Sequence, residues 1–316
     1  MSEQSVGAPR AITGGNLRAW KRRDTGDRVR IPLRRQIALQ TLCVFVALTV
    51  LFPIMWVLSL ALDPRDLLRP DGLNLIPPGA SLDNFFAAIE QPSQAPVSFW
   101  TLAFNSFLLA ISTALFSVLI GVFAAYAFSR VQFRGRQVLM LTVLAVLMLP
   151  TVATIVPLFI LLGQVRLGDV ILRSTLAGVA FAVVSGLLPF AIWNLKGYLD
   201  TIPKDLEEAA AMDGASRHQS FVKVVLPLAV PALAVTGFLG FVAGWTEYYF
   251  SVTFLRDPNT YTLSVALNGM VGAFATTTPW GKFCAFAILF ALPVSLVYAV
   301  FQRWIIGGLA VGGVKG

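Results

Sequence analysis

The stretch EEAAAMDGASRHQSFVKVVLP, residues 207–227, interrupts an apolar chain with acids, bases and the only histidine in the sequence. On its N-terminal side lies an uncharged segment from Ser174 to Leu195, and a second uncharged segment begins at Val224 and runs to Thr246. Each is long enough to cross a bilayer, which takes about 20 residues. The 207–227 stretch must therefore meet water on one side of a membrane.

The whole composition agrees with a membrane protein. Of the 316 residues 57% are hydrophobic and only 13% are charged, whereas soluble domains average about 25% charged residues. Within a bilayer the backbone is satisfied only in helices or closed barrels, and continuous apolar runs favour helices. The sequence predicts an all-α polytopic membrane protein with six transmembrane helices, at about 36–62, 99–129, 137–165, 174–195, 224–250 and 283–306.

Basic residues indicate the orientation of these helices. Segments 1–35, 130–136, 196–223 and 303–316 hold 18 of the 24 Lys and Arg residues. Because basic residues concentrate in cytoplasmic segments, both termini are expected in the cytoplasm. The basic tail over 1–35 is then a positive anchor for the first span, although a nucleic-acid-binding arm has a similar composition. The external segment from Asp63 to Glu90 is expected to be an ordered loop or short helices.

The sequence contains no recognisable catalytic, metal-binding or nucleotide-binding motif. Cys43 and Cys284 both fall inside predicted spans, without metal-ligand spacing and without a disulfide framework. No phosphate-binding glycine loop, zinc motif or nucleophile elbow is visible. We therefore expect no catalytic residue, metal or cofactor on this chain, and no nucleic-acid partner.

Local signals predict two short helices in the charged stretch. Asp205, Glu207 and Glu208 suit the first turn of a helix, and alanines follow. Gly214 suits the end of that helix, because the residue there often needs a positive φ. Ser216 and Gln219 have the spacing of a capping box, and Lys204 can pair with Glu208 one turn later. These signals alone fit an interfacial helix and a docking element equally well.

A longer pattern favours docking. The stretch fits E-A-A-x3-G-x9-[IV]-x-L-P from Glu208 to Pro227. It resembles the EAA loop of the membrane-spanning subunits of binding-protein-dependent ABC importers. AYAFSRVQFRGR (125–136) and MLPTVATIVPLF (148–159) resemble carbohydrate permeases, and TFLRDPNTYTLSVAL (253–267) and QRWIIGGLAVGGVKG (302–316) are similar to the shorter permease of the maltose-type importers.

This resemblance implies a coupling loop over 200–223 that inserts into a cytoplasmic ATPase subunit. Glu208 would be the charged contact and Gly214 the bend, with His218 a surface residue or a pH sensor. ATP and Mg would then belong to the partner. The implied coupling residues are Glu208, Ala209, Ala210, Asp213, Gly214, Leu226 and Pro227.

Two further groups of residues have competing interpretations. The first group consists of polar and aromatic residues inside or at the ends of spans. These residues either line a translocation path, or they bridge neighbouring helices and anchor them at the membrane surface. They are Asn105, Asn194, Glu247 and Tyr248. The second group lies in the last predicted external segment. These residues either contact the solute-binding protein or belong to an ordinary polar loop. They are Asn259, Tyr261, Asn268 and Trp280. The glycine-rich tail over 307–316 is either frayed or reaches between the ATPase subunits.

The predicted function is therefore the permease subunit of an ABC sugar importer in the bacterial or archaeal cytoplasmic (inner) membrane. By resemblance its substrate is an oligosaccharide such as maltodextrin or another α-glucoside. Its partners would be a second permease in a heterodimer, two ATPase subunits, a solute-binding protein and membrane lipid. A secondary, ion-coupled transporter is the alternative, but the six predicted cores lack the buried ionisable residues that this class needs. A membrane-embedded enzyme lacks a titratable pair in the cores.

Overall fold

The computed structural model describes residues 32–65, 75–271 and 278–312, with the backbone alone at 167 and 305–312. The chain divides into two units, residues 1–54 and 55–316. In the first unit the described residues belong mainly to helix α2 (Leu33–Ala61), which continues into the second. Most of the predicted basic tail, 1–31, and the last four residues of the predicted glycine-rich tail, 313–316, lie outside the described residues.

Helices account for most of the described structure, and strands for very little of it. Four of them are individually long and apolar enough to span a membrane: α2, α4 (Phe99–Arg130), α7 (Leu176–Leu199) and α14, which extends from Trp280 to Gly312. Two bent pairs of helices pass the same test, so taking each pair as one span gives six. The predicted all-α polytopic fold is confirmed.

The third and fifth spans, predicted over 137–165 and 224–250, are each broken by a bend. The third consists of α5 (Arg136–Leu147) and α6 (Thr151–Gln164), bent by 104° at a break that contains Pro150. Proline cannot donate a backbone hydrogen bond, and it disfavours a helical residue before it.

The fifth span is bent by 74° just before α11 (Val230–Trp245). Pro231, at the start of α11, has no N–H to continue the helical ladder across this break. Beyond Trp245 the chain leaves the helix and begins a separate short helix, α12 (Tyr249–Phe254). The predicted span over 224–250 therefore covers the last part of the helical run Arg217–Leu228, all of α11 and the first residues of α12.

The centre of the second unit is formed by α4, α7 and α11, which pack on one another. The contact between α4 and α11 depends on small residues. A Cβ atom added to Gly244 would lie 2.7 Å from Ala110 Cα, and one added to Gly240 would lie 2.8 Å from Ala114 Cα. Glycine at both positions lets the two backbones approach closely, as is common between membrane helices.

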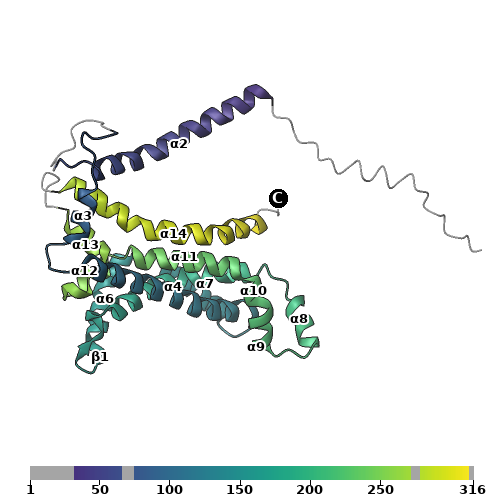
Figure 1. Ribbon diagram of the computed structural model, residues 1–316. Helices are drawn as coiled ribbons and strands as arrows, with labels where there is room; N and C mark the ends of the chain where they lie inside the picture. Colours follow the sequence, from purple (N-terminus) through teal and green to yellow (C-terminus); the bar gives the residue numbers. More distant parts are fainter. Residues whose placement is uncertain (1–31, 66–74, 272–277, 313–316) are drawn as a thin grey trace, which may run out of the picture. The chain divides into compact units, whose positions relative to one another are not determined.

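Short elements lie at the two ends of these long helices (Figure 1). One end carries α8 (Asp205–Met212), α9 (Arg217–Ser220), the π-helical turn η2 (Phe221–Val225) and α10 (Leu226–Leu228). The opposite end carries α3 (Asp83–Glu90), the hairpin β1 (Arg166–Leu167) and β2 (Val170–Ile171) with Arg166 opposite Ile171, η1 (Leu172–Ser174), α12, η3 (Pro258–Thr260) and α13 (Leu263–Gly269). The two segments with predicted functional residues are thus on opposite ends.

Candidate functional site

Helix α8 has the local structure that its sequence predicts. Three acids occupy its first turn, where the helix dipole favours negative charge. At its other end Gly214 has φ +86°, the left-handed conformation that glycine adopts without strain. The Gly214 N–H donates to the Ala211 carbonyl (3.0 Å) and the Ala215 N–H to the Ala210 carbonyl (2.9 Å). These two bonds make a Schellman ending, so the turn is fixed in shape.

The second short helix begins with the predicted capping box. The Ser216 hydroxyl accepts from the Gln219 N–H at 3.3 Å, and the Gln219 side chain accepts from the Ser216 N–H at 2.8 Å. The predicted capping box is therefore confirmed. Together with the Gly214 turn, it sets the direction in which the chain leaves α8.

The two faces of α8 differ in their surroundings. On the outer face Glu208 and Ala209 are exposed, and Met212 is 89% exposed. Asp213 and Gly214 continue this exposed surface, whereas Ala210 is half-buried. A methionine and an alanine beside an exposed carboxylate leave an accessible, slightly apolar surface that another protein can approach.

The inner face is held by an ion pair that sequence reasoning missed. Glu207 Oε1 lies 2.5 Å from Arg130 Nε, at the C-terminal end of α4. The predicted pairing of Lys204 with Glu208 is wrong, because no such ion pair occurs among the described residues. An exposed pair on one helix is worth only about 0.3–0.5 kcal/mol, too little to fix two long side chains.

A second set of polar contacts surrounds this pair. Ser129 donates to Asp200 Oδ1 at 2.6 Å, and Lys196 Nζ lies 2.5 Å from Asp200 Oδ2. Burial of Asp200 raises the pKa of its carboxyl, but hydrogen bonds from Lys196 and Ser129 outweigh this and leave the pKa below its ordinary value. Asp200 is therefore ionised at neutral pH, and it connects the end of α7 to the end of α4.

Apolar packing anchors the rest of the segment. Phe221, at the start of η2, is buried with its ring 4.6 Å from that of Tyr126, measured between centroids. Val225 and Ala229 are fully buried in the same cluster, with Leu226 packed against it. Pro227 is exposed within α10. Of the predicted coupling residues, Glu208, Ala209, Asp213 and Gly214 thus share one surface, and Leu226 secures its base.

Comparison with known proteins agrees with this geometry. Residues 117–310 match the family model "Binding-protein-dependent transport system inner membrane component". This chain belongs to that family. It is therefore the inner-membrane permease component of a binding-protein-dependent transport system, and the resemblance seen in its sequence is confirmed.

Individual relatives support the same conclusion. The chain is 37% identical to the maltose/maltodextrin transport system permease protein MalG of Yersinia pestis, over 86% of this chain and 90% of that protein. It is also 37% identical to the Escherichia coli MalG protein, over 87% and 94%. A solved bacterial ABC transporter involved in import of the acidic polysaccharide alginate matches with a TM-score of 0.68 at 25% identity, covering 85% of this chain and 96% of that one.

Two of the predicted path residues of the permease, Asn105 and Asn194, bond different elements. Asn105, near the start of α4, donates to the Asn259 and Tyr261 carbonyls at 2.8 and 2.9 Å, so it fixes the η3 segment to α4. Asn194 on α7 donates to Thr236 Oγ1 on α11 at 3.0 Å. Both amides therefore bridge neighbouring elements, and their contact with a substrate stays a prediction.

Glu247 is buried and caps α12. Its carboxylate accepts from the Phe250 N–H (2.8 Å), the Ser251 N–H (2.9 Å) and the Ser251 hydroxyl (2.7 Å). This arrangement gives it a structural role at the helix start, which an acid two residues before a short helix could have signalled. Tyr248 beside it is half-buried, with its ring 5.5 Å from that of Tyr249.

The predicted binding-protein contacts differ in exposure. Asn259 and Asn268 are exposed, whereas Tyr261 and Trp280 are half-buried. Tyr261 packs against the clusters that surround the start of α4, and the Trp280 ring makes an edge contact with Phe283. The two asparagines are thus the more accessible members of this group.

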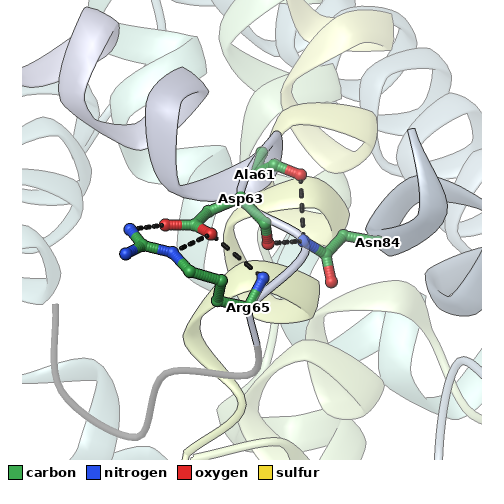
Figure 2. Close-up of polar contacts among 4 residues, drawn as sticks. All are labelled: Ala61, Asp63, Arg65 and Asn84. Atoms are coloured by element: carbon green, nitrogen blue, oxygen red, sulfur yellow. Dashed lines mark hydrogen bonds and ion pairs between the residues drawn. The ribbon is translucent and has the colours of Figure 1, made fainter. Parts of the chain in front are cut away.

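The same end of the permease contains a polar junction (Figure 2). Arg65 donates to both carboxylate oxygens of Asp63, at 2.9 and 2.7 Å, and its backbone N–H also bonds Asp63 at 3.0 Å. Asn84 on α3 donates to the Asp63 and Ala61 carbonyls at 2.7 and 3.2 Å. A Cβ atom on Gly281 would lie 2.6 Å from Asn84 Nδ2, so α14 begins directly against α3.

Proposed function

We propose that this permease carries an oligosaccharide of the maltodextrin or α-glucoside class across the inner membrane, driven by ATP hydrolysis on separate subunits. The substrate class is suggested by the relatives, which are named for maltose and maltodextrin transport and for alginate import. A second permease, two ATPase subunits and an external solute-binding protein complete the proposed assembly, with both termini of this chain in the cytoplasm.

One observation supports the energy coupling more than any other. The exposed surface of Glu208, Ala209 and Met212 is bounded by the rigid Gly214 turn, and it belongs to a helix whose inner face is bonded to α4 through Glu207. Such a surface can dock into a cleft on the ATPase, and the bonded inner face prevents α8 from yielding when the cleft closes. ATP-driven closure would then shift the population between inward-open and outward-open permease.

For the substrate path we retain Asn194 and Tyr248. The amide oxygen of Asn194 and the ring of Tyr248 are the groups that can meet a sugar with a hydrogen bond and a stacking contact. Asn259 and Asn268 are proposed to contact the solute-binding protein, because both are exposed at the end opposite α8.

Reversal of one charge tests the docking proposal. Glu208→Arg should leave membrane insertion intact, abolish copurification of the ATPase subunits and reduce sugar uptake to background, since it places a cation at the proposed acidic contact. Glu90→Arg is the matched control, because it makes the same exchange on an exposed residue at the opposite end. Normal uptake and copurification in Glu208→Arg would contradict the proposal.

A further inference from the structure

Arg130 and Glu207 join two elements that are far apart in the sequence. Their side chains are only 9% and 15% exposed, so the pair is largely removed from water. Both carboxylate oxygens of Glu207 are used, because Tyr126 donates its hydroxyl to Oε2 at 2.8 Å. Two residues on α4, one turn apart, therefore hold one carboxylate of α8.

The same guanidinium also holds the chain before α8. Arg130 Nη2 donates to the Ile202 carbonyl at 2.9 Å, and Nη1 donates to Ser129 Oγ at 3.0 Å. Arg130 thus contacts the linker that enters α8 and the first turn of α8 itself. A displacement of α8 relative to α4 would break these bonds together.

No other part of α8 is tied as firmly to a membrane-spanning helix. Apart from Glu207, its side chains are exposed or, at Ala210, half-buried and apolar. Helix α4 in turn extends over 32 residues to the opposite end of the permease, where Asn105 bonds the η3 segment. A rigid helix therefore runs from the Arg130–Glu207 pair to the external end.

We propose that Arg130 and Glu207 are positioning residues that transmit the movement of α8 to α4 during transport. This inference rests on the proposed docking of α8 to an ATPase, and it assigns the two acids of the EE sequence different roles. Glu208 faces the partner, and Glu207 faces the permease. Loss of the inner contact would leave the ATPase bound but disconnected from the membrane helices.

The test uses the assembled transporter with its ATPase subunits, second permease and binding protein. In Glu207→Gln the ATPase should copurify at the wild-type level, because the Glu208 surface is unchanged. Uptake should fall by about tenfold or more, since Arg130 is left without its counter-charge in a largely buried site. Stimulation of ATP hydrolysis by the loaded binding protein should be lost as well. Asp205→Asn, which removes an exposed acid from the same turn, should change none of these.

Exchange of the two charges separates transmission from general instability. Glu207→Arg combined with Arg130→Glu should regain uptake relative to either single variant, because the pair is restored in reverse. Tyr126→Phe keeps the ring contact with Phe221 and removes one hydrogen bond, so uptake should fall by about two- to threefold. It serves as the second variant if the exchange does not accumulate in the membrane.

Three results would overturn the proposal: wild-type uptake in Glu207→Gln, an exchange no better than the single variants, or an unchanged rate in Tyr126→Phe. Each leaves the docking of the ATPase intact. Failure of the docking proposal is recognised separately. In that case Glu208→Arg would copurify with the ATPase and transport sugar like the wild-type protein.

Discussion

Carboxylates at the two ends of this permease are used differently. At the α12 end Glu247 bonds groups three and four residues away, and Asp63 bonds Arg65 two residues away. At the α8 end Glu207 bonds Arg130 and Tyr126, 77 and 81 residues away, and Asp200 bonds Ser129, 71 residues away. Local bonds fix the shape of one turn, whereas distant bonds make separate helices move together. The carboxylates at the α8 end therefore join separate helices, whereas those at the α12 end hold individual turns in shape.

Two of the left-handed glycines, one at each end, give the largest expected contrast between the ends. Gly214 ends α8 with φ +86°, and Gly79 lies at the opposite end with φ +74°. Aspartate at either position introduces strain of about 1 kcal/mol. Gly214→Asp should also abolish ATPase copurification and uptake, because it alters the proposed docking surface. Gly79→Asp should lower the melting temperature as much as Gly214→Asp does, but it should leave ATPase copurification unchanged. Equal loss of copurification in both variants would contradict the contrast.

Substitution of Glu247 should have the second-largest effect, and this effect is on the folding stability of the permease. Glu247→Ala leaves the buried N–H groups of Phe250 and Ser251 without an acceptor, which should cost about 2 to 4 kcal/mol of folding free energy. Thermal unfolding of the purified permease measures this loss. Glu247→Gln retains one acceptor oxygen and should fall between the two. Glu90→Ala, at an exposed acid on α3, is the control and should leave the melting temperature unchanged.

If Glu247→Ala unfolds at the wild-type temperature but loses uptake, the carboxylate contacts substrate rather than capping α12. That result would return Glu247 to the translocation path. It would also remove Glu247 from the carboxylates that only stabilise a nearby turn.

The smallest effect concerns pH at the Asp63 junction. The hydrogen bond from Arg65 lowers the pKa of Asp63 below its ordinary value of 3.8. Stability gained from this ionised carboxyl is therefore present above pH 3.8 and is lost as the pH falls through the lower pKa of the folded state. Asp63→Asn should melt slightly below wild type at neutral pH, and the difference should disappear in acid. A difference that grows on acidification would contradict this assignment.

How much of this structure could be predicted depends on the range of the interactions. The Gly214 turn and the Ser216–Gln219 box were predictable, because each depends on residues within five positions. The apolar runs likewise predicted the helices, since a membrane leaves the backbone few alternatives. Pro150 and Pro231 mark the broken spans, but bends of 104° and 74° depend on packing that sequence alone does not contain.

The Arg130–Glu207 pair could not be predicted, because its two residues are far apart in the sequence. Spacing along one helix suggested Lys204 with Glu208, but the adjacent acid turns inward to a cation 77 residues away. Nothing local distinguishes the two neighbouring glutamates. Only the packing of α8 against the end of α4 assigns one to the interior and one to the surface.

Photo-crosslinking from single positions tests the central claim, that α8 docks to the ATPase, most directly. A photoreactive residue at Met212, 89% exposed at the end of α8, should form an adduct with the ATPase subunit in an assembly active for uptake. The same residue at Ile76, 85% exposed between α2 and α3, should form none with that subunit. An active assembly in which Met212 reacts with the external binding protein, or in which Ile76 alone reacts with the ATPase, would contradict the account.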